Sequence, residues 1–165
     1  MFEVVLYQPE IPPNTGNIIR LCAGTGATLH LIEPLGFHLE DKSLRRAGLD
    51  YHEFATVRRH ASLAAFREAL PERRIFALTK FATTSLYSAN FESGDVFLFG
   101  SESRGLPPDI ATRIPLYQNL RIPMRREIRS LNLANAASIV VYEALRQCIG
   151  GLGTLTLAEH PSTRS

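Results

Sequence analysis

The stretch LRIPMRREIRSLNLANAASIVVYEALRQ, residues 120–147, decides the fold of this chain. Its apolar beginning, Leu120–Ile122, is typical of the end of a strand, and Pro123 stops that strand because proline lacks a backbone donor and fixes φ. The loop that follows is basic and carries three arginines: Arg125, Arg126 and Arg129.

A long helix is predicted after this loop. Ser130 and Asn132 are residue types that cap helices, and the apolar run that begins at Leu133 contains no glycine before Gly150. The run is apolar around most of its circumference, and such a helix is buried on more than one side. We therefore expect one face to pack on the protein's own sheet and another against a second subunit. Because a basic loop does little for the stability of a buried helix, we expect the loop to form part of the functional site.

The composition is that of one soluble globular domain. The chain has 165 residues, 45% of them apolar and 21% charged, and is long enough to bury a core. We expect a single domain over residues 1–150, followed by a flexible tail at residues 151–165. No apolar run reaches the length of a membrane span and no signal-peptide pattern begins the chain, so we expect a cytoplasmic protein without membrane contact.

Cysteine, histidine and charge narrow the possible partners. Cys22 and Cys148 lie in apolar contexts without CxxC spacing, and the histidines form no ligand motif, so we expect buried free thiols and no metal. The net charge of +2 says little about partners. Paired arginines suit phosphate contacts but are also common on solvated surfaces, so charge alone leaves nucleic-acid binding open. These pairs are at positions 45–46, 58–59, 73–74 and 125–126.

Strands alternate with helices along the chain. We expect strands at residues 2–7, 28–32, 56–59, 74–78, 95–99 and 116–122, helices at 15–22, 42–47, 62–70 and 133–149, and a short helix after Pro108. This alternation predicts an α/β fold whose mainly parallel sheet carries helices on both faces. Ligands of such sheets bind beyond the carboxyl ends of the strands. We therefore expect the site to form from the loops after Tyr7, Leu78, Phe99 and Ile122.

Two of these loops have unusual residues. NTGNIIR, at 14–20, gathers an amide, a hydroxyl and a glycine at a helix start, where free N–H groups favour an anion. Within it Asn17 and Arg20 are three residues apart and share a helix face. GSESRGLP, at 100–107, places a glycine directly after a buried strand, which allows a ligand to approach the backbone. Either segment alone could be an ordinary capped helix or turn, and their position at matching strand ends is what favours a site.

Three segments of the chain resemble the motifs of the SPOUT methyltransferases: NTGNIIR at 14–20, FGSESRGLP at 99–107 and IPMRREIRSLNLANA at 122–136. The resemblance continues through DKSLRRAGLDYHEF and VVYEALRQ to about Gln147, and it is closest to the YibK/TrmL type, the 2′-O-methyltransferases of the tRNA wobble ribose. It implies an α/β domain with a C-terminal trefoil knot that acts as a homodimer and binds S-adenosylmethionine. No periodicity indicates the knot, which rests on the resemblance alone.

The resemblance also implies roles for individual residues. The cofactor would contact Leu78, Gly100, Ile122, Ser130 and Leu131, mainly through backbone groups and apolar surface. The residues expected to shape the loops or contact the substrate are Asn14, Asn17, Glu102, Arg129 and Asn132.

Arg20 and Tyr142 match the positions that act in catalysis in this family. A guanidinium with a pKa above about 12 is a poor base, so we expect Arg20 to stabilise the developing alkoxide or to clamp a phosphate. Tyr142 would hydrogen-bond the target ribose or pack against a base.

The function implied by the resemblance is S-adenosylmethionine-dependent 2′-O-methylation of the wobble nucleotide, cytidine or uridine 34, in the anticodon loop of leucine tRNAs. Three alternatives remain open. The same chemistry could act on another tRNA position or on ribosomal RNA, or the chain could be a non-catalytic RNA-binding module. A small-molecule nucleotide enzyme is the third, and the absence of a phosphate-binding fingerprint argues against it.

Overall fold

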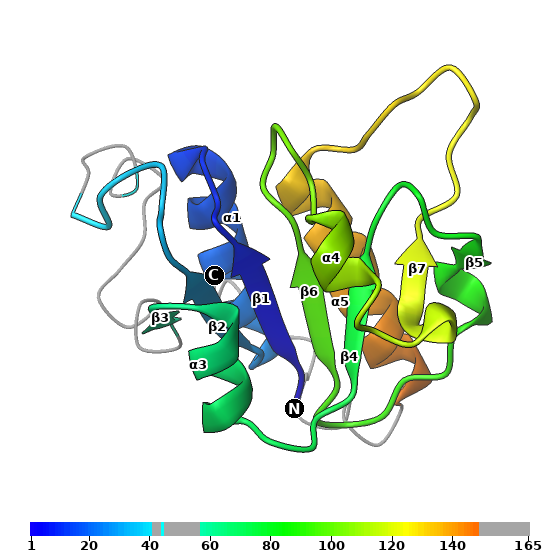
Figure 1. Cartoon of the computed structure of the whole chain (residues 1–165), viewed down its shortest axis with the longest axis horizontal. Helices are drawn as coiled ribbons and strands as arrows, with labels where there is room; N and C mark the ends of the chain where they lie inside the picture. The colour runs from blue at the N-terminus through cyan, green and yellow to red at the C-terminus, as the bar shows by residue number, and fades with distance from the viewer. Residues whose placement is uncertain (41–43, 45–56, 149–165) are drawn as a thin grey trace, which may run out of the picture.

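The computed structural model describes residues 1–40, 44 and 57–148. Four sequence predictions fall on residues that the structure does not describe: the helix at 42–47 apart from Leu44, the arginine pair at 45–46, most of the resembling segment at 41–54, and the tail at 151–165. The described elements, in chain order, are β1 Glu3–Tyr7, α1 Pro12–Thr25, β2 Thr28–Ile32, β3 Val57–His60, α3 Leu63–Ala69, β4 Ile75–Leu78, β5 Thr84–Ser85, the 3-10 helix η2 Leu86–Ser88, β6 Val96–Phe99, α4 Pro108–Ala111, the 3-10 helix η3 Leu116–Gln118, β7 Asn119–Arg121 and α5 Leu133–Gln147 (Figure 1).

Seven strands of the described chain form one sheet in the order β3-β2-β1-β6-β4-β7-β5, and every neighbouring pair is parallel. Helices α1 and α5 cover one face of the sheet, and α3 and α4 cover the other (Figure 1). The central strand β6 is buried at all of its residues, as a parallel strand between two helical layers must be. The predicted α/β fold is therefore confirmed, while the trefoil knot stays a prediction.

Helix α1 begins earlier than predicted. We expected a rigid loop up to Asn14, because three prolines precede it, but the helix starts at Pro12 with Ile11 in the capping position. Proline is tolerated in the first helical turn because the N–H it lacks would have no partner inside the helix. The helix also runs past Cys22 to Thr25, and Gly26, one of the two glycines expected to stop it, closes it in the left-handed region with a φ of 74°.

The carboxyl-terminal half of the sheet differs from the prediction at two places. No strand is predicted between residues 78 and 95, but Thr84–Ser85 forms the edge strand β5, paired with β7. Two residues are too few to show an alternating pattern, so only the neighbouring strand makes this segment extended. The last predicted strand is shorter than 116–122, because Leu116–Gln118 turns as the 3-10 helix η3 before β7 begins.

In the single chain, helix α5 has one fully buried face. Its inward residues pack against the sheet and α1, as predicted, and they are Ala134, Ala137, Val140, Val141, Ala144 and Leu145. A stripe of outward residues at helical spacing stays exposed: Asn135, Tyr142 and Arg146. Contact of this outer face with a second subunit stays a prediction. Within the described residues, no helix combines the length and the apolar character that crossing a membrane requires.

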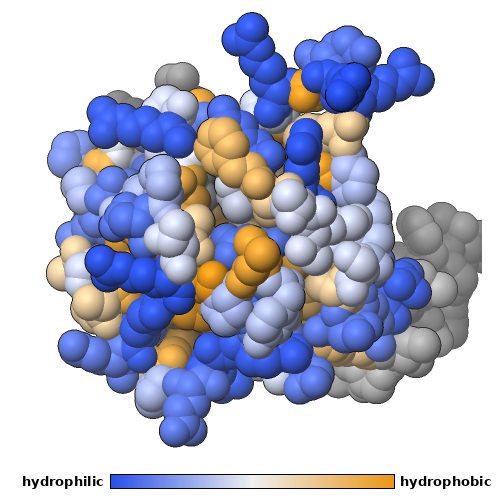
Figure 2. Space-filling view, turned by 45° about the vertical axis from the view of Figure 1, so that its right-hand side comes forward, coloured by the Kyte–Doolittle hydropathy of each residue, from blue (hydrophilic) through white to orange (hydrophobic). Residues whose placement is uncertain are grey.

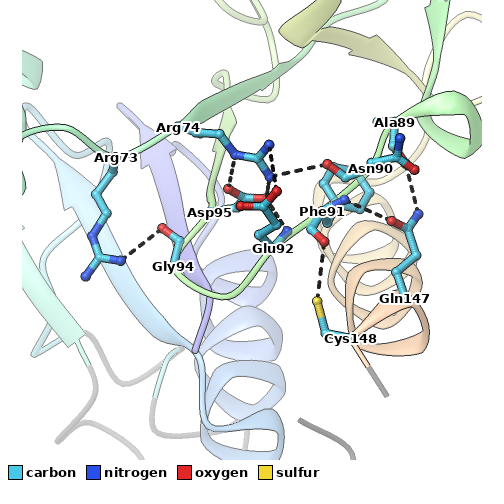
Figure 3. A network of polar contacts seen from close by, with 10 residues as sticks. All are labelled: Arg73, Arg74, Ala89, Asn90, Phe91, Glu92, Gly94, Asp95, Gln147 and Cys148. Atoms are coloured by element: carbon cyan, nitrogen blue, oxygen red, sulfur yellow. Dashed lines mark hydrogen bonds and ion pairs between the residues drawn. The ribbon is translucent and has the colours of Figure 1, made fainter. Parts of the chain in front are cut away.

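A polar network holds the last turn of α5 near the amino ends of β4 and β6 (Figure 3). These ends are opposite to the carboxyl ends, where the loops predicted to form the site begin. The Gln147 side chain accepts a hydrogen bond from the Phe91 amide at 2.9 Å and donates one to the Ala89 carbonyl at 3.0 Å. Beside it, the buried Asp95 carboxylate accepts from Nε and Nη2 of Arg74 at 2.8 and 2.6 Å. The network fixes the start of β4, the turn before β6 and the end of α5 relative to one another.

We predict that Arg74→Ala lowers the free energy of unfolding by about 1–3 kcal/mol, because it leaves the Asp95 carboxylate buried without its cation. This is less than a fully buried pair would lose, since 37% of the Arg74 side chain is exposed. Urea denaturation measures the change. The matched control is Arg67→Ala, an exposed arginine on α3 that we expect to change stability by no more than about 0.5 kcal/mol. Equal effects of the two substitutions would contradict the role of the ion pair.

Candidate active site

A cavity of about 530 Å³ lies at the carboxyl ends of β4, β6 and β7. Its walls come from the ends of these strands and the loops that follow them, and the start of α1 contributes Ile11 and Asn14. All four loops selected from the sequence therefore take part. The physical reason is that parallel strands end at the same edge, so their following loops converge there.

Nine of the twelve residues predicted for the site line this cavity. They are Asn14, Leu78, Gly100, Glu102, Ile122, Arg129, Ser130, Leu131 and Asn132. The other three, Asn17, Arg20 and Tyr142, do not line it and are exposed.

The start of α1 is occupied by a carboxylate of the protein itself. Glu102 accepts hydrogen bonds from the backbone amides of Glu10 at 2.8 Å and Ile11 at 3.1 Å. Ile11 has no side chain that could cap the helix, so Glu102 supplies the negative charge that a helix start favours. The anion that the sequence led us to expect at this helix start is thus Glu102 rather than a ligand.

Asn14 connects this carboxylate to the start of α5. Its side-chain amide donates to Glu102 Oε1 at 3.2 Å, and its Oδ1 accepts from Asn132 Nδ2 at 2.8 Å. Because a carboxylate only accepts, the orientation of the Asn14 amide is fixed. Asn132 Oδ1 in turn accepts from the backbone amides of Ala134 and Asn135 and caps α5, as its residue type predicted. We call Glu102, Asn14 and Asn132 the loop-linking chain.

Gly100 is required by the fold of its own loop. A Cβ at this position would lie 2.0 Å from backbone atoms of Gly105 and Leu106, so no side chain fits. The loop returns on itself through a hydrogen bond from the Gly105 amide to the Ser101 carbonyl at 2.8 Å. We interpreted Gly100 as a point where a ligand approaches the backbone, but the backbone that it admits is that of residues 105 and 106.

A second carboxylate holds the tip of this loop. Glu10 accepts hydrogen bonds from the Ser103 amide at 3.0 Å and from the Ser103 hydroxyl at 2.7 Å, and these bonds lower the pKa of Glu10. Glu10 also donates its backbone amide to Glu102. The segment before α1 and the loop at residues 100–107 therefore each donate hydrogen bonds to a carboxylate of the other.

The rim of the cavity is cationic. Four basic side chains line it, namely Lys80, Arg104, Arg121 and Arg129, against the single carboxylate of Glu102. The segment after β7 rises above the sheet edge (Figure 1), and hydrophilic side chains project at the top of this side of the molecule (Figure 2). Arg125 and Arg126 belong to this segment and are exposed. The site thus combines a largely apolar interior with a positive entrance.

Arg20 and Tyr142 lie at similar depths below the cavity. Arg20 is eight residues after the start of α1 and Tyr142 nine after the start of α5, which correspond to helical rises of about 12 and 13.5 Å. Both helices begin at the cavity and pack on the same face of the sheet. Asn17 shares the exposed side of α1 with Arg20, as the spacing predicted. The two predicted catalytic side chains thus lie on the outer surface of the α1–α5 layer.

The sequence analysis missed part of the cavity wall. Thr79, Lys80 and Phe81 follow β4 and line the cavity, but none of them is among the residues predicted for the site. The strand-end rule already selected the loop after Leu78, and the one signal that could have drawn attention to Phe81 is an aromatic residue among polar ones.

The described residues contain no group of three His, Cys, Asp or Glu side chains arranged to hold a metal ion. Both cysteines are free. Cys22 is buried as predicted, and its burial raises the pKa of the thiol to about 12, whereas Cys148 is only partly buried. Neither thiol faces the cavity.

We predict that Asn132→Ala destabilises the protein by about 1–2 kcal/mol, because the start of α5 loses its cap. Asn132→Asp keeps the acceptor that caps the helix but cannot donate to Asn14. It should therefore retain most of the stability while weakening the protection of the α1 start against amide hydrogen exchange. If Asn132→Asp were as destabilising as Asn132→Ala, capping would not be the main contribution of this residue.

Comparison with known proteins agrees with this geometry. The model of the SpoU rRNA Methylase family matches residues 1–142. A tRNA (cytidine(34)-2′-O)-methyltransferase of Aeromonas hydrophila is 57% identical over 155 residues, which cover 94% of this chain and 99% of the relative.

Solved structures show the same relationship. A structure that addresses 2′-OH methylation of cytidine or uridine 34 on tRNA has a TM-score of 0.85 and 52% identity, and the match covers 91% of this chain and 97% of the other. An AdoMet-bound rRNA methyltransferase of Sinorhizobium meliloti has a TM-score of 0.76 and 26% identity, over 89% of this chain and 56% of the other. The resemblance found in the three motifs is thereby confirmed, and the chain belongs to the SpoU rRNA methylase family.

Proposed function

We propose that this protein transfers a methyl group from S-adenosylmethionine to the ribose 2′-hydroxyl of the wobble nucleotide, cytidine or uridine 34, of tRNA in the cytoplasm. The observation that carries the proposal is the cavity formed by the three motif loops in a chain whose relatives bear this activity in their names. Leucine tRNAs are the substrates that the sequence resemblance favours.

The cavity suits S-adenosylmethionine. Its volume of about 530 Å³ is within the range of roughly 300–1,000 Å³ that small-molecule sites occupy. Apolar side chains would contact the adenine and the carbon chain, among them Leu78 and Ile122 at strand ends and Leu131 before α5, while backbone groups of the same loops would orient them. When bound, S-adenosylmethionine supplies a methyl group made electrophilic by the positive sulfur.

The cationic rim suits the RNA rather than the cofactor. S-Adenosylmethionine carries a net positive charge, so four basic side chains at the entrance would not attract it. A tRNA brings a phosphate at every nucleotide, and arginine side chains bind phosphate oxygens with two parallel hydrogen bonds. We infer that Arg129 and its basic neighbours hold the backbone of the anticodon loop at the cavity mouth.

Catalysis would depend mainly on positioning. The ribose hydroxyl has to approach the methyl group in line, and holding two reactants in such a geometry supplies much of the rate. Glu102 is the one carboxylate in the cavity wall, but three N–H donors already occupy its oxygens, so it shapes the loops rather than accepting the proton. A positively charged Arg20 would stabilise the alkoxide that develops on the ribose.

Arg20 and Tyr142 would act in the cavity of a second subunit. Neither lines the cavity of its own chain, and both lie on the outer surface of the α1–α5 layer. If this surface is the homodimer interface, each cavity is completed by Arg20 and Tyr142 of the partner subunit. This arrangement supports the homodimer that the resemblance implied and explains why the outer face of α5 carries a tyrosine and an arginine.

The proposal predicts methylation of tRNA taken from cells that lack this activity. Purified protein and S-adenosylmethionine should produce 2′-O-methylcytidine or 2′-O-methyluridine at the wobble position, detected by mass spectrometry of digested RNA. Binding of S-adenosylmethionine without modification of tRNA would contradict the proposed substrate and make ribosomal RNA the next candidate. A protein that binds RNA but not S-adenosylmethionine would be a non-catalytic module.

We further predict that two inactive variants restore each other when mixed. Arg20→Ala removes a residue that acts on the partner's cavity, and Ile122→Arg blocks the cavity of its own subunit. After subunit exchange at equal amounts, half of the dimers are mixed and each has one intact site, so activity should recover to about a quarter of the wild-type value. No recovery in mixed dimers, identified by two different affinity tags, would show that Arg20 acts within its own subunit.

A further inference from the structure

Phe81 is an exposed aromatic side chain at the entrance of the cavity. It lies in the loop after β4, lines the cavity, and 77% of its surface is accessible. A single exposed apolar residue is common and needs no explanation. Phe81 is different because it adjoins the proposed reaction centre, and Figure 2 shows apolar surface lying between hydrophilic projections on this side of the molecule.

The loop holds the backbone of Phe81 in a defined place. Thr79 accepts a hydrogen bond from the Phe81 amide through its hydroxyl at 3.2 Å and one from the Ala82 amide through its carbonyl at 3.3 Å. The Thr79 amide donates to the Leu120 carbonyl at 3.0 Å, which ties the turn to β7. Ala82 is buried and anchors the other end of the turn. An aromatic ring carried on such a fixed turn has only its own two side-chain torsions to lose when a ligand covers it.

A cation accompanies the ring. Lys80 Nζ lies 5.1 Å from the centroid of the Phe81 ring, within the range of a cation–π contact. An aromatic ring next to an ammonium group matches a nucleotide, in which a flat base is joined to a phosphate. S-Adenosylmethionine also carries a flat adenine, but no phosphate adjoins that base and its single carboxylate lies at the far end of the molecule, so the pair suits a nucleotide of RNA better than the cofactor.

We propose that Phe81, with Lys80 beside it, is the platform on which the base of the nucleotide to be methylated stacks. The inference rests on the proposed function and deepens it. The ribose must lie at the cavity mouth for its hydroxyl to react, so the base joined to it lies a few ångströms away, at the position of the exposed ring. Single-stranded RNA bases are bound in this manner, by stacking on aromatic side chains after leaving their own stack. Because every base has a flat face, the platform positions the nucleotide without selecting its identity.

The test uses the full-length protein and an anticodon stem-loop RNA. Phe81→Ala should lower kcat/KM for the RNA by about 5- to 160-fold, the value of one stacked base. Phe81→Trp should restore most of the activity. The dissociation constant for S-adenosylmethionine, measured by calorimetry, should change less than twofold in both variants. Tyr87→Ala is the matched control: Tyr87 is an exposed aromatic residue in η2 that does not line the cavity, and its loss should leave kcat/KM unchanged.

A second RNA with no base at the target nucleotide identifies the stacking partner. Wild-type protein should lose activity on this RNA by about the same factor that Phe81→Ala loses on the normal RNA, and Phe81→Ala should lose little more when the base is removed. Independent, multiplying losses would overturn the proposal, because Phe81 would then not contact that base. A weaker binding of S-adenosylmethionine that matches the loss in kcat/KM would also overturn it and assign Phe81 to the cofactor. The wild-type rate on the normal RNA distinguishes failure of the proposed function from failure of this inference. Absence of methyl transfer by the wild-type protein would reject the proposed function. Methyl transfer that Phe81→Ala does not impair would reject only the stacking role of Phe81.

Discussion

The hydrogen bonds that join Glu102, Asn14 and Asn132 are the constraint on which the site depends. These residues come from three segments that are far apart in the sequence, and Asn14 and Asn132 are separated by 118 positions. Within this loop-linking chain, Glu102 supplies the negative charge at the start of α1, and Asn132 caps α5. The start of each helix is therefore fixed by a residue that also shapes the cavity. Because the groups lie in a partly buried place, leaving one of them without its partner costs more than the bond itself contributes.

The parallel sheet explains why a site can form at this edge. Because the strands are parallel, the loops that follow them all lie at the carboxyl ends of the strands, while helices cover both faces of the sheet. At the amino ends of the strands, the Arg74–Asp95 pair and Gln147 close the structure with hydrogen bonds. The two ends of the strands thus have different physical roles: the amino ends contribute stability, and the carboxyl ends form the ligand site.

The apolar interior and the cationic rim of the site match the two molecules that it is proposed to bind. An apolar interior with backbone hydrogen-bonding groups accepts a small molecule with few strong anionic features, whereas the cationic rim attracts a polyanion. Phe81 lies where these regions meet, and Lys80 joins the ring to the positive rim. Arg20 and Tyr142 lie outside both regions in a single chain, which is why their proposed role requires a partner subunit.

The sequence alone determined the kind of fold, the loops of the site and most of its residues. The alternation of strand and helix patterns predicted a parallel sheet, and the strand-end rule then selected the loops without knowledge of their conformation. Asn132 could be recognised as a cap because capping depends only on residues a few positions away. The resemblance in three motifs added the chemistry, which periodicity does not encode.

Only the tertiary structure decided how these parts meet. The partner of the α1 start is Glu102, about ninety residues away, and no local pattern specifies a contact over that distance. The two-residue strand β5 exists because β7 lies beside it, and Gly100 is needed because the backbone of residues 105 and 106 returns against it. The exposed position of Arg20 and Tyr142 also follows from packing between helices. Local propensities set the elements and the loops, whereas contacts between distant residues determined which charge, ring or amide faces the cavity.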